Sequence, residues 1–249
     1  SRGLGDVYKR QEKAGIIKPG VPVVTGYQPA EVMARIAAEA AQKGAKQLRR
    51  GLDWSAEPSA EGMVYDGLAL PKPALAGLHQ IENAGIALTA LRAAGFRMSP
   101  EAMAQGLRNA SWPARMQRLT GRLAQALPAG SALWLDGAHN PGGAEIIARQ
   151  LQDWDGPTTL VLGMKQSKDV AEFIRIVAPH AARIFAVAEA GQHLALPVEA
   201  IIEASGGQAL PGPDIAGAFR QITAPTRVLI CGSLYLAGEV LKQDETVLA

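Results

Sequence analysis

Leu133-Trp-Leu-Asp-Gly-Ala-His-Asn-Pro141 is the stretch that decides the fold of this 249-residue chain. A short apolar run ends in an acid, a glycine, a histidine and an asparagine, and a helix is predicted to start at Pro141. Open α/β sheets bind their ligands at the carboxyl ends of their strands. The stretch therefore predicts a buried strand that ends in a polar binding segment.

The residues around this stretch alternate between apolar runs and helical periodicity. Strands are predicted at 115–119, 133–136, 159–163, 183–187 and 227–231, and helices at 142–153, 169–177, 197–204, 214–222 and 234–242. Strands separated by helices are typical of a mostly parallel sheet that is covered on both faces. We therefore expect a Rossmann-like α/β domain over residues 112–249, with its boundary at Trp112-Pro113.

Residues 1–111 are expected to form a separate unit. A strand is predicted at 21–25 and an Ala-rich helix at 31–43. Short runs at 52–55, 62–67 and 68–70 predict an accessory sheet of small antiparallel strands between Gln47 and Leu70. Helices are predicted at 78–94 and 101–110, the second with Ser99 as N-cap and Pro100 at its first position. Residues 1–11 form a polar stretch that differs from the sequence that follows and lacks an initiator Met. We therefore expect these residues to be non-native and the natural protein to continue upstream.

The composition narrows the class of protein. Lys and Arg number 25 against 23 Asp and Glu, and this near balance gives no electrostatic reason to expect a nucleic-acid or membrane partner. No apolar run approaches the roughly 18 residues that a membrane-spanning helix needs. The one cysteine, Cys231, lies in an apolar run and cannot form an internal disulfide. We expect a cytoplasmic, monomeric protein.

The polar residues after Leu135 have two readings. The carboxylate of Asp136 can accept both hydroxyls of a ribose, and His139 or Asn140 can donate to phosphate or carboxylate oxygens. Alternatively, Asp136 and Asn140 only cap the helix that starts at Pro141. His139 is harder to explain as a cap.

Three other segments carry polar groups that suit a nucleotide or a carboxylate. Asn83, near the start of a helix, offers a donor and an acceptor in one plane, as the edge of adenine requires, but it can equally be an ordinary polar residue. Arg115 can reach a phosphate from the domain junction, or it can be merely solvated. The Gly232-Ser233 turn presents backbone N–H groups and a hydroxyl at a helix N-terminus, where a carboxylate can bind.

Together with Glu12-Lys-Ala-Gly-Ile16, these segments in this order resemble the folylpolyglutamate synthase and dihydrofolate synthase family, the folate branch of the Mur-ligase-type ATP-dependent amide ligases. The resemblance covers residues 12–242, and its most specific pieces are Leu135-Asp-Gly-Ala-His-Asn-Pro141 and Gly232-Ser-Leu-Tyr-Leu-Ala-Gly-Glu239. It implies a C-terminal Rossmann-like domain preceded by the incomplete second half of a P-loop-type ATP-binding central domain.

The resemblance also implies roles for individual residues. Asn83 matches the adenine-contacting asparagine, Arg115 the arginine at the ATP phosphates, and Asp136 the ribose-binding aspartate. His139 and Ser233 match positions that line the site where glutamate and the acyl phosphate meet, so the implied catalytic residues are Arg115 and His139.

Two further features follow from the same comparison with the family pattern. Lys13 matches a lysine that can be carbamoylated and would then offer hard oxygens to Mg²⁺; the alternative is a surface lysine. Lys165, Lys168 and Asp169 resemble a family loop, although such a run is often only a solvated helix start. Ala114 stands where the family has glycine, with Arg115 still in register.

The implied reaction uses ATP and Mg²⁺ to activate a carboxylate of dihydropteroate or of a reduced folate as an acyl phosphate, which L-glutamate then attacks. Hinge motion near Trp112-Pro113 is expected to accompany it. The sequence contains no Gly-x-x-x-x-Gly-Lys-[Ser/Thr] phosphate loop, so the isolated chain is expected to be inactive. The alternatives are a part of a peptidoglycan Mur ligase and a non-catalytic Rossmann-like nucleotide-binding or interaction module.

Overall fold

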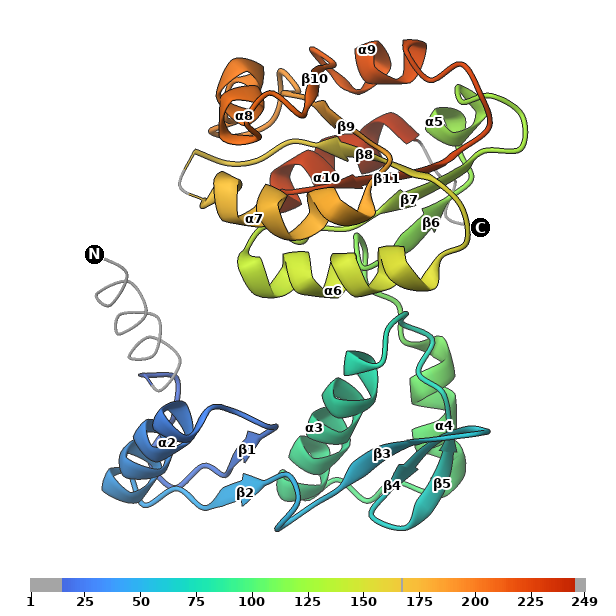
Figure 1. The fold of residues 1–249 in the computed structure, drawn as a ribbon. Coiled ribbons are helices and arrows are strands. Elements are labelled where there is room, and N and C mark those ends of the chain that lie inside the picture. Colours follow the sequence, from blue (N-terminus) through green and yellow to red (C-terminus); the bar gives the residue numbers. More distant parts are fainter. Residues whose placement is uncertain (1–14, 167, 245–249) are drawn as a thin grey trace. The chain divides into compact units, whose positions relative to one another are not determined.

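The structure is a computed structural model that describes residues 15–166 and 168–244 (Figure 1). The chain divides into two compact units, Ser1–Ser111 and Trp112–Ala249. Each unit has its own hydrophobic core.

The first unit begins with a strand, a helix and a second strand. β1 (Val23–Thr25) and β2 (Gln47–Arg49) pair in parallel, and α2 (Ala30–Gln42) connects them. A glycine follows the helix, Gly44, with a φ of 59°, a left-handed conformation that glycine adopts without steric cost. Because the two strands are parallel, their carboxyl ends lie at the same edge.

A three-stranded antiparallel sheet follows, in the order β3 (Ala56–Ser59), β4 (Gly62–Tyr65), β5 (Leu68–Pro71). α3 (His79–Ala93) contacts β3 and α4 (Pro100–Asn109) contacts β5 (Figure 1). Gly85 permits the close approach of α3, because a Cβ atom there would lie 2.5 Å from the Trp54 ring. The core between these elements is formed by Trp54, Ala56, Met63, Tyr65, Leu70, Ile81, Ala84, Leu88 and Leu107.

The structure confirms the accessory antiparallel sheet and the three helices predicted for this unit, including the cap of α4, where the Ser99 hydroxyl accepts from the amide of Ala102 at 3.2 Å. The strand predicted at 52–55 is wrong, because Leu52 and Asp53 form a turn. β2 and β3 were not predicted as strands, and β2 pairs in parallel with β1 instead of joining the antiparallel sheet. The turn is closed by the Asp53 carboxylate, which accepts from the amide of Arg49 at 2.8 Å.

The second unit is built on a six-stranded sheet in the order β10-β9-β8-β11-β7-β6. Neighbouring strands are parallel, except that β6 is antiparallel to β7. The strands are β6 (Gln117–Leu119), β7 (Ala132–Leu135), β8 (Thr158–Leu162), β9 (Arg183–Ala186), β10 (Leu210–Pro211) and β11 (Arg227–Cys231). The unit is therefore an α/β fold with a mixed, mostly parallel sheet, as predicted.

Helices cover both faces of this sheet (Figure 1). The helices are α5 (Arg122–Gln125), α6 (Pro141–Asp153), α7 (Val170–Val177), α8 (Val198–Ala204), α9 (Ile215–Arg220) and α10 (Leu234–Asp244). The connections through α6, α7 and α8 all run in one direction along the sheet, so right-handed crossovers place these helices on one face. The chain reverses direction between β10 and β11, and α9 and α10 accordingly pack on the other face, where Ile215 and Leu236 join the core with Val161 and Val228.

The remaining differences from prediction are small. The short elements α5 and β10 were not predicted, because four and two residues are too few to show a periodicity. Across residues 15–166 and 168–244, no helix has the length and apolar character needed to cross a bilayer.

Candidate functional site

Three neighbouring strands of the second unit bring their carboxyl ends to one edge of the sheet. β7 leads toward α6 on one face, whereas β11, its neighbour, leads toward α10 on the other face. Ligands of open α/β sheets bind where neighbouring strands diverge in this way. The segments at that point are Asp136–Asn140 after β7, Gly163–Lys165 after β8 and Gly232–Ser233 after β11.

Backbone hydrogen bonds join these segments. The amide of Gly232 donates to the carbonyl of Ala138 at 2.9 Å, and the amide of Gly163 donates to the carbonyl of Cys231 at 3.1 Å. Gly232 has a φ of 109°, and a Cβ atom on it would lie 2.7 Å from the carbonyl oxygen of Gly163. Only glycine fits there, because the backbones of the two loops approach too closely for a side chain.

Asp136 lies at the centre of the edge and is 6% exposed. One carboxylate oxygen accepts from the amide of Ala138 at 2.7 Å, and the other accepts from the amide of Met116 at 2.8 Å. The side chain thus ties the end of β7 to the segment before β6. Each oxygen of a carboxylate can accept more than one hydrogen bond, so a carboxylate can accept from a backbone amide and from a ligand hydroxyl at the same time.

The segment that carries Arg115 is held in an unusual backbone conformation. Ala114 and Met116, on either side of it, have φ values of 54° and 42°. The carbonyl of Ala114 accepts from the amide of Gly137 at 2.8 Å, and the bond from Met116 to Asp136 fixes the other side. The Arg115 side chain itself is exposed. Ala114 therefore adopts the left-handed conformation for which the family pattern places a glycine.

His139 and Asn140 have separate roles. The carboxamide of Asn140 accepts from the amide of Gly143 at 2.9 Å and caps α6, as the capping alternative predicted for this residue. Asp136 does not cap that helix. His139 is half-buried, and its Nδ1 lies 2.8 Å from the carbonyl oxygen of Gly137. Because a carbonyl only accepts, Nδ1 is the donor in this contact and carries a proton.

Ser233 caps α10. Its hydroxyl is 3% exposed and accepts from the amides of Tyr235 at 3.1 Å and Leu236 at 3.4 Å. Cys231, one strand position before the Gly232 turn, is buried, and burial together with the charge of Asp136 raises the pKa of its thiol. Cys231 is therefore a protonated core residue rather than a nucleophile.

Asn83 belongs to the first unit, so the structure does not group it with Asp136, His139 and Ser233. It lies on α3, where its Nδ2 donates to the carboxamide oxygen of Gln80 at 3.0 Å. Both residues line a cavity of about 320 Å³ between α3 and α4, whose other walls are apolar. Gln80 was not predicted as a site residue, although its spacing of three residues from Asn83 places both on one helix face.

The other candidates are peripheral. Lys13 lies outside the described residues. Asp169 caps α7 by accepting from the amide of Glu172 at 3.1 Å, as the alternative of a helix start predicted. The Nζ atom of Lys165 lies 5.2 Å from the centre of the Tyr235 ring, and the amide of Lys168 donates to the carbonyl of Lys165 at 3.1 Å. Within the described ranges, no group of three or more His, Cys, Asp or Glu residues could hold a metal ion.

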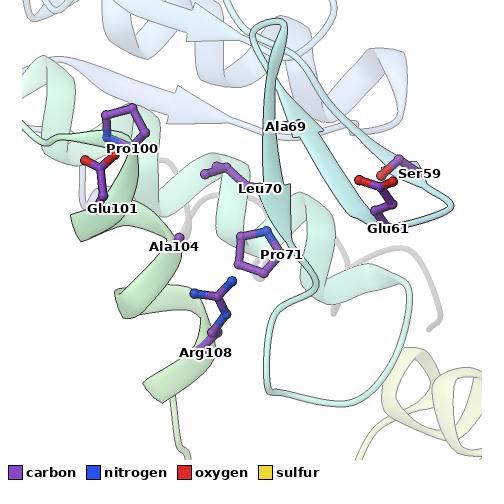
Figure 2. A pocket seen from close by; sticks show the side chains of 9 residues that line it. All are labelled: Ser59, Glu61, Ala69, Leu70, Pro71, Pro100, Glu101, Ala104 and Arg108. Carbon is purple, nitrogen blue, oxygen red and sulfur yellow. The ribbon is translucent and has the colours of Figure 1, made fainter.

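A second cavity in the first unit, of about 510 Å³, lies between β5 and α4 (Figure 2). Glu61, Glu101 and Arg108 line it, and all three are exposed. None of the residues predicted from the sequence belongs to its lining. We therefore assign no function to this cavity.

Comparison with known proteins gives the family. The folylpolyglutamate synthase of Lacticaseibacillus casei is 28% identical over 255 residues, covering 92% of this chain and 55% of the relative. A solved structure of Escherichia coli FolC in complex with DHPP and ADP superposes with a TM-score of 0.79 at 27% identity, over 96% of this chain and 57% of that chain. The chain belongs to the folylpolyglutamate synthase/dihydrofolate synthase family. No protein-family model matches it.

Another member of the folylpolyglutamate synthase/dihydrofolate synthase family has been solved with Mn, AMPPNP and L-glutamate bound, and it matches with a TM-score of 0.78 at 29% identity, over 94% of this chain and 56% of that chain. The chain thus spans about half the length of the relatives it matches. The resemblance drawn from the sequence is confirmed at the level of the family. The roles of Asn83, Arg115, Asp136, His139 and Ser233 stay predictions.

Proposed function

We propose that this chain is part of an ATP-dependent ligase that adds L-glutamate to dihydropteroate, to the glutamyl tail of reduced folates, or to both. The γ-phosphoryl group of ATP would pass to the acceptor carboxylate, giving ADP and an acyl phosphate. The amine of L-glutamate would then attack the acyl carbon, forming the amide and releasing phosphate. We also propose a cytoplasmic location, where these substrates are found together.

The observation that carries the proposal is the arrangement of Asp136, His139 and Ser233 at one edge of a sheet in a member of this family. The two loops that hold them are joined by the bond between Gly232 and Ala138. Reactions of this class depend mainly on positioning and charge neutralisation, which a rigid edge of this kind provides.

Each residue of the second unit has a proposed task that its geometry allows. Arg115 is exposed and can offset the charge of phosphate oxygens, and its backbone is held on both sides. The Nε2 atom of His139 and the hydroxyl of Ser233 would contact glutamate or the acyl phosphate. Asp136 would accept a ribose hydroxyl while it supports the Arg115 segment.

In the first unit, Asn83 would contact adenine at the polar side of the cavity between α3 and α4. The relatives' structures contain ADP, or AMPPNP with Mn, and we propose ATP with Mg²⁺ here. No Mg²⁺ ligand is assigned among the described residues, since they offer no cluster of three suitable side chains. The Rossmann-like second unit would follow the second half of a P-loop-type central domain.

The test is a chimera in which this chain replaces the matching part of the Lacticaseibacillus casei relative. We expect ATP- and glutamate-dependent ligation with dihydropteroate or a reduced folate, and no ligation by the 249-residue chain alone, whose sequence lacks a phosphate loop. Arg115→Ala should reduce turnover of the chimera by at least about tenfold. The matched control, Arg149→Ala, removes an exposed arginine from α6 and should leave turnover unchanged.

Two results would contradict the proposal. Ligation by the 249-residue chain alone would show that these 249 residues contain a complete active site. Equal turnover of the Arg115→Ala and Arg149→Ala chimeras would remove Arg115 from the mechanism. A non-catalytic binding module would be indicated if ATP shifts the NMR signals of residues 136–139 while the chimera shows no ligation in the presence of both substrates.

A further inference from the structure

Gln80, the second residue of α3, is a buried polar residue whose side-chain carbonyl oxygen and NH₂ group both have partners. It is 7% exposed. Its carbonyl oxygen accepts from Nδ2 of Asn83 at 3.0 Å, and its Nε2 lies 2.9 Å from Nε2 of His79. An amide NH₂ group only donates, so in this arrangement Nε2 of His79 is the acceptor. In this arrangement the carbonyl oxygen of Gln80 is the acceptor that faces the NH₂ group of Asn83.

The backbone beside these residues supports the same arrangement. Gly77 has a φ of 105°, and a Cβ atom on it would lie 2.5 Å from Cε1 of His79. The absence of that Cβ atom lets the His79 ring lie against the turn that starts the helix. The ring can thus stay within hydrogen-bond distance of Gln80.

The consequence falls on Asn83. One of its N–H groups is used by Gln80, and the exposed carboxamide keeps a second N–H and a carbonyl oxygen. An amide presented in this way pairs with the N6 and N7 atoms of adenine. The same edge of guanine carries two acceptors, O6 and N7, so the carbonyl oxygen of Asn83 would oppose O6.

The surroundings suit a planar base. Asn83 and Gln80 border the cavity of about 320 Å³, and Ala84, Ala87 and Met103 are among the apolar residues that form its walls. Cavities of this size and character, with a few polar groups to orient the ligand, are typical of small-molecule sites. A purine ring that enters the cavity would meet the amide edge in a set pose.

We propose that Gln80 is a positioning residue that fixes the Asn83 carboxamide in the orientation that selects adenine over guanine nucleotides. The inference rests on the proposed function, which places ATP at Asn83. Without Gln80 the carboxamide of Asn83 can rotate, and the flipped form places its NH₂ group opposite the amino group of adenine. Gln80 then determines base selectivity without touching the nucleotide.

The experiment measures ATP and GTP binding to the 249-residue chain by NMR titration, for the wild type and three variants. The wild type should prefer ATP by about tenfold or more, as a bidentate contact with a base allows. Gln80→Leu should bring the ratio of the two affinities close to one. Gln80→Glu keeps an acceptor for Asn83 and should restore the preference. Gln47→Leu, a matched control in the same unit whose Nε2 contacts the sulfur of Met33, should leave the ratio unchanged.

A double-mutant cycle separates positioning from a general structural effect. Gln80→Leu should have no further effect on the ratio once Asn83 is changed to alanine, whereas a structural role would add to it. The side-chain NH₂ signals of Asn83 provide a readout without nucleotide, since loss of the hydrogen bond to Gln80 should shift them. Unchanged Asn83 signals or an unchanged ratio in Gln80→Leu would overturn the inference alone. Failure of the wild type to bind ATP at millimolar concentration would overturn the inference but not the proposed function, because this chain lacks a phosphate loop and the ligation assay with the chimera tests that function.

Discussion

Replacing Asp136 with asparagine tests whether this carboxylate supports the site as well as binding ligand. In the structure both oxygens accept from backbone amides, of Met116 at 2.8 Å and of Ala138 at 2.7 Å. Asparagine has one carbonyl oxygen and one NH₂ group, so it can replace only one of these bonds. Its NH₂ group would face the remaining backbone N–H at a position that is 6% exposed.

The magnitude follows from the bond that is lost and the strain that is released. A hydrogen bond to a charged group contributes about 1.5–3 kcal/mol. Met116, with a φ of 42°, would be free to leave the left-handed region, which returns about 1 kcal/mol. We therefore expect the free energy of unfolding of the second unit to fall by about 1.5 kcal/mol. For a unit of this size the corresponding decrease in Tm is about 6 °C.

Calorimetry of the wild type and the variant gives the change in Tm, and hydrogen exchange assigns it to a unit. Amides of β7, β8 and β11 should lose protection, while those of the first unit should not. The control is Asp169→Asn, because Asp169 caps α7 at an exposed position and asparagine caps a helix as well as aspartate does. If Asp136→Asn destabilises the protein no more than Asp169→Asn, the carboxylate does not support the loop and the reasoning fails.

Three further predictions concern the neighbouring strand end. Gly232→Ala should lower the free energy of unfolding by more than about 2 kcal/mol, because the φ of 109° at Gly232 and the nearby backbone exclude a Cβ atom. Gly238, on α10, has open space around it, so Gly238→Ala should raise the free energy of unfolding by about 0.5–1 kcal/mol. Urea unfolding measures both changes. Burial raises the pKa of Cys231, so its thiol stays protonated in the folded protein, whereas the thiol of the unfolded chain ionises above about pH 8.5. The free energy of unfolding should therefore fall between about pH 8 and 10. Cys231→Ala should remove the part of this decrease that comes from the thiol. Ser233→Ala removes a helix cap and should lower the free energy of unfolding by about 1 kcal/mol; it should also weaken L-glutamate binding by the chimera. Ser99→Ala, which removes the cap of α4, should lower the free energy of unfolding by a similar amount and leave glutamate binding unchanged.

The large elements of the fold were predictable from the sequence because their signals are local. Each strand of the main sheet is a short apolar run bounded by turn residues, and each helix between them has an apolar face. Ser99 as N-cap and Pro100 as the first helical residue correctly predicted where α4 starts. The direction of β2 was not predictable, because the sequence of a three-residue strand does not indicate which strand it pairs with. Its parallel pairing with β1 follows from α2, which connects the two strands.

The contents of the candidate site were predictable by residue type but not by role. Asp136 and Asn140 both stand near a helix start, and the sequence offers capping as one explanation for both. In the structure Asn140 caps the helix, whereas Asp136 joins two loops through amides that lie 20 residues and two residues away. The contact between Met116 and Asp136 depends on a left-handed backbone conformation of Met116. Methionine rarely adopts this conformation, so the sequence gives no reason to expect it.

The relation between Asp136 and Arg115 shows why support and catalysis are hard to separate at this edge. The carboxylate that is proposed to bind ribose also fixes the amide next to Arg115, so any loss of activity in an Asp136 variant combines a lost ligand contact with a displaced arginine. A measurement of stability separates the two effects, because a ligand contact contributes nothing to the free protein. If Asp136→Asn and Arg115→Ala both reduce turnover of the chimera but only Asp136→Asn lowers the Tm, then the carboxylate acts partly through the segment that carries the arginine.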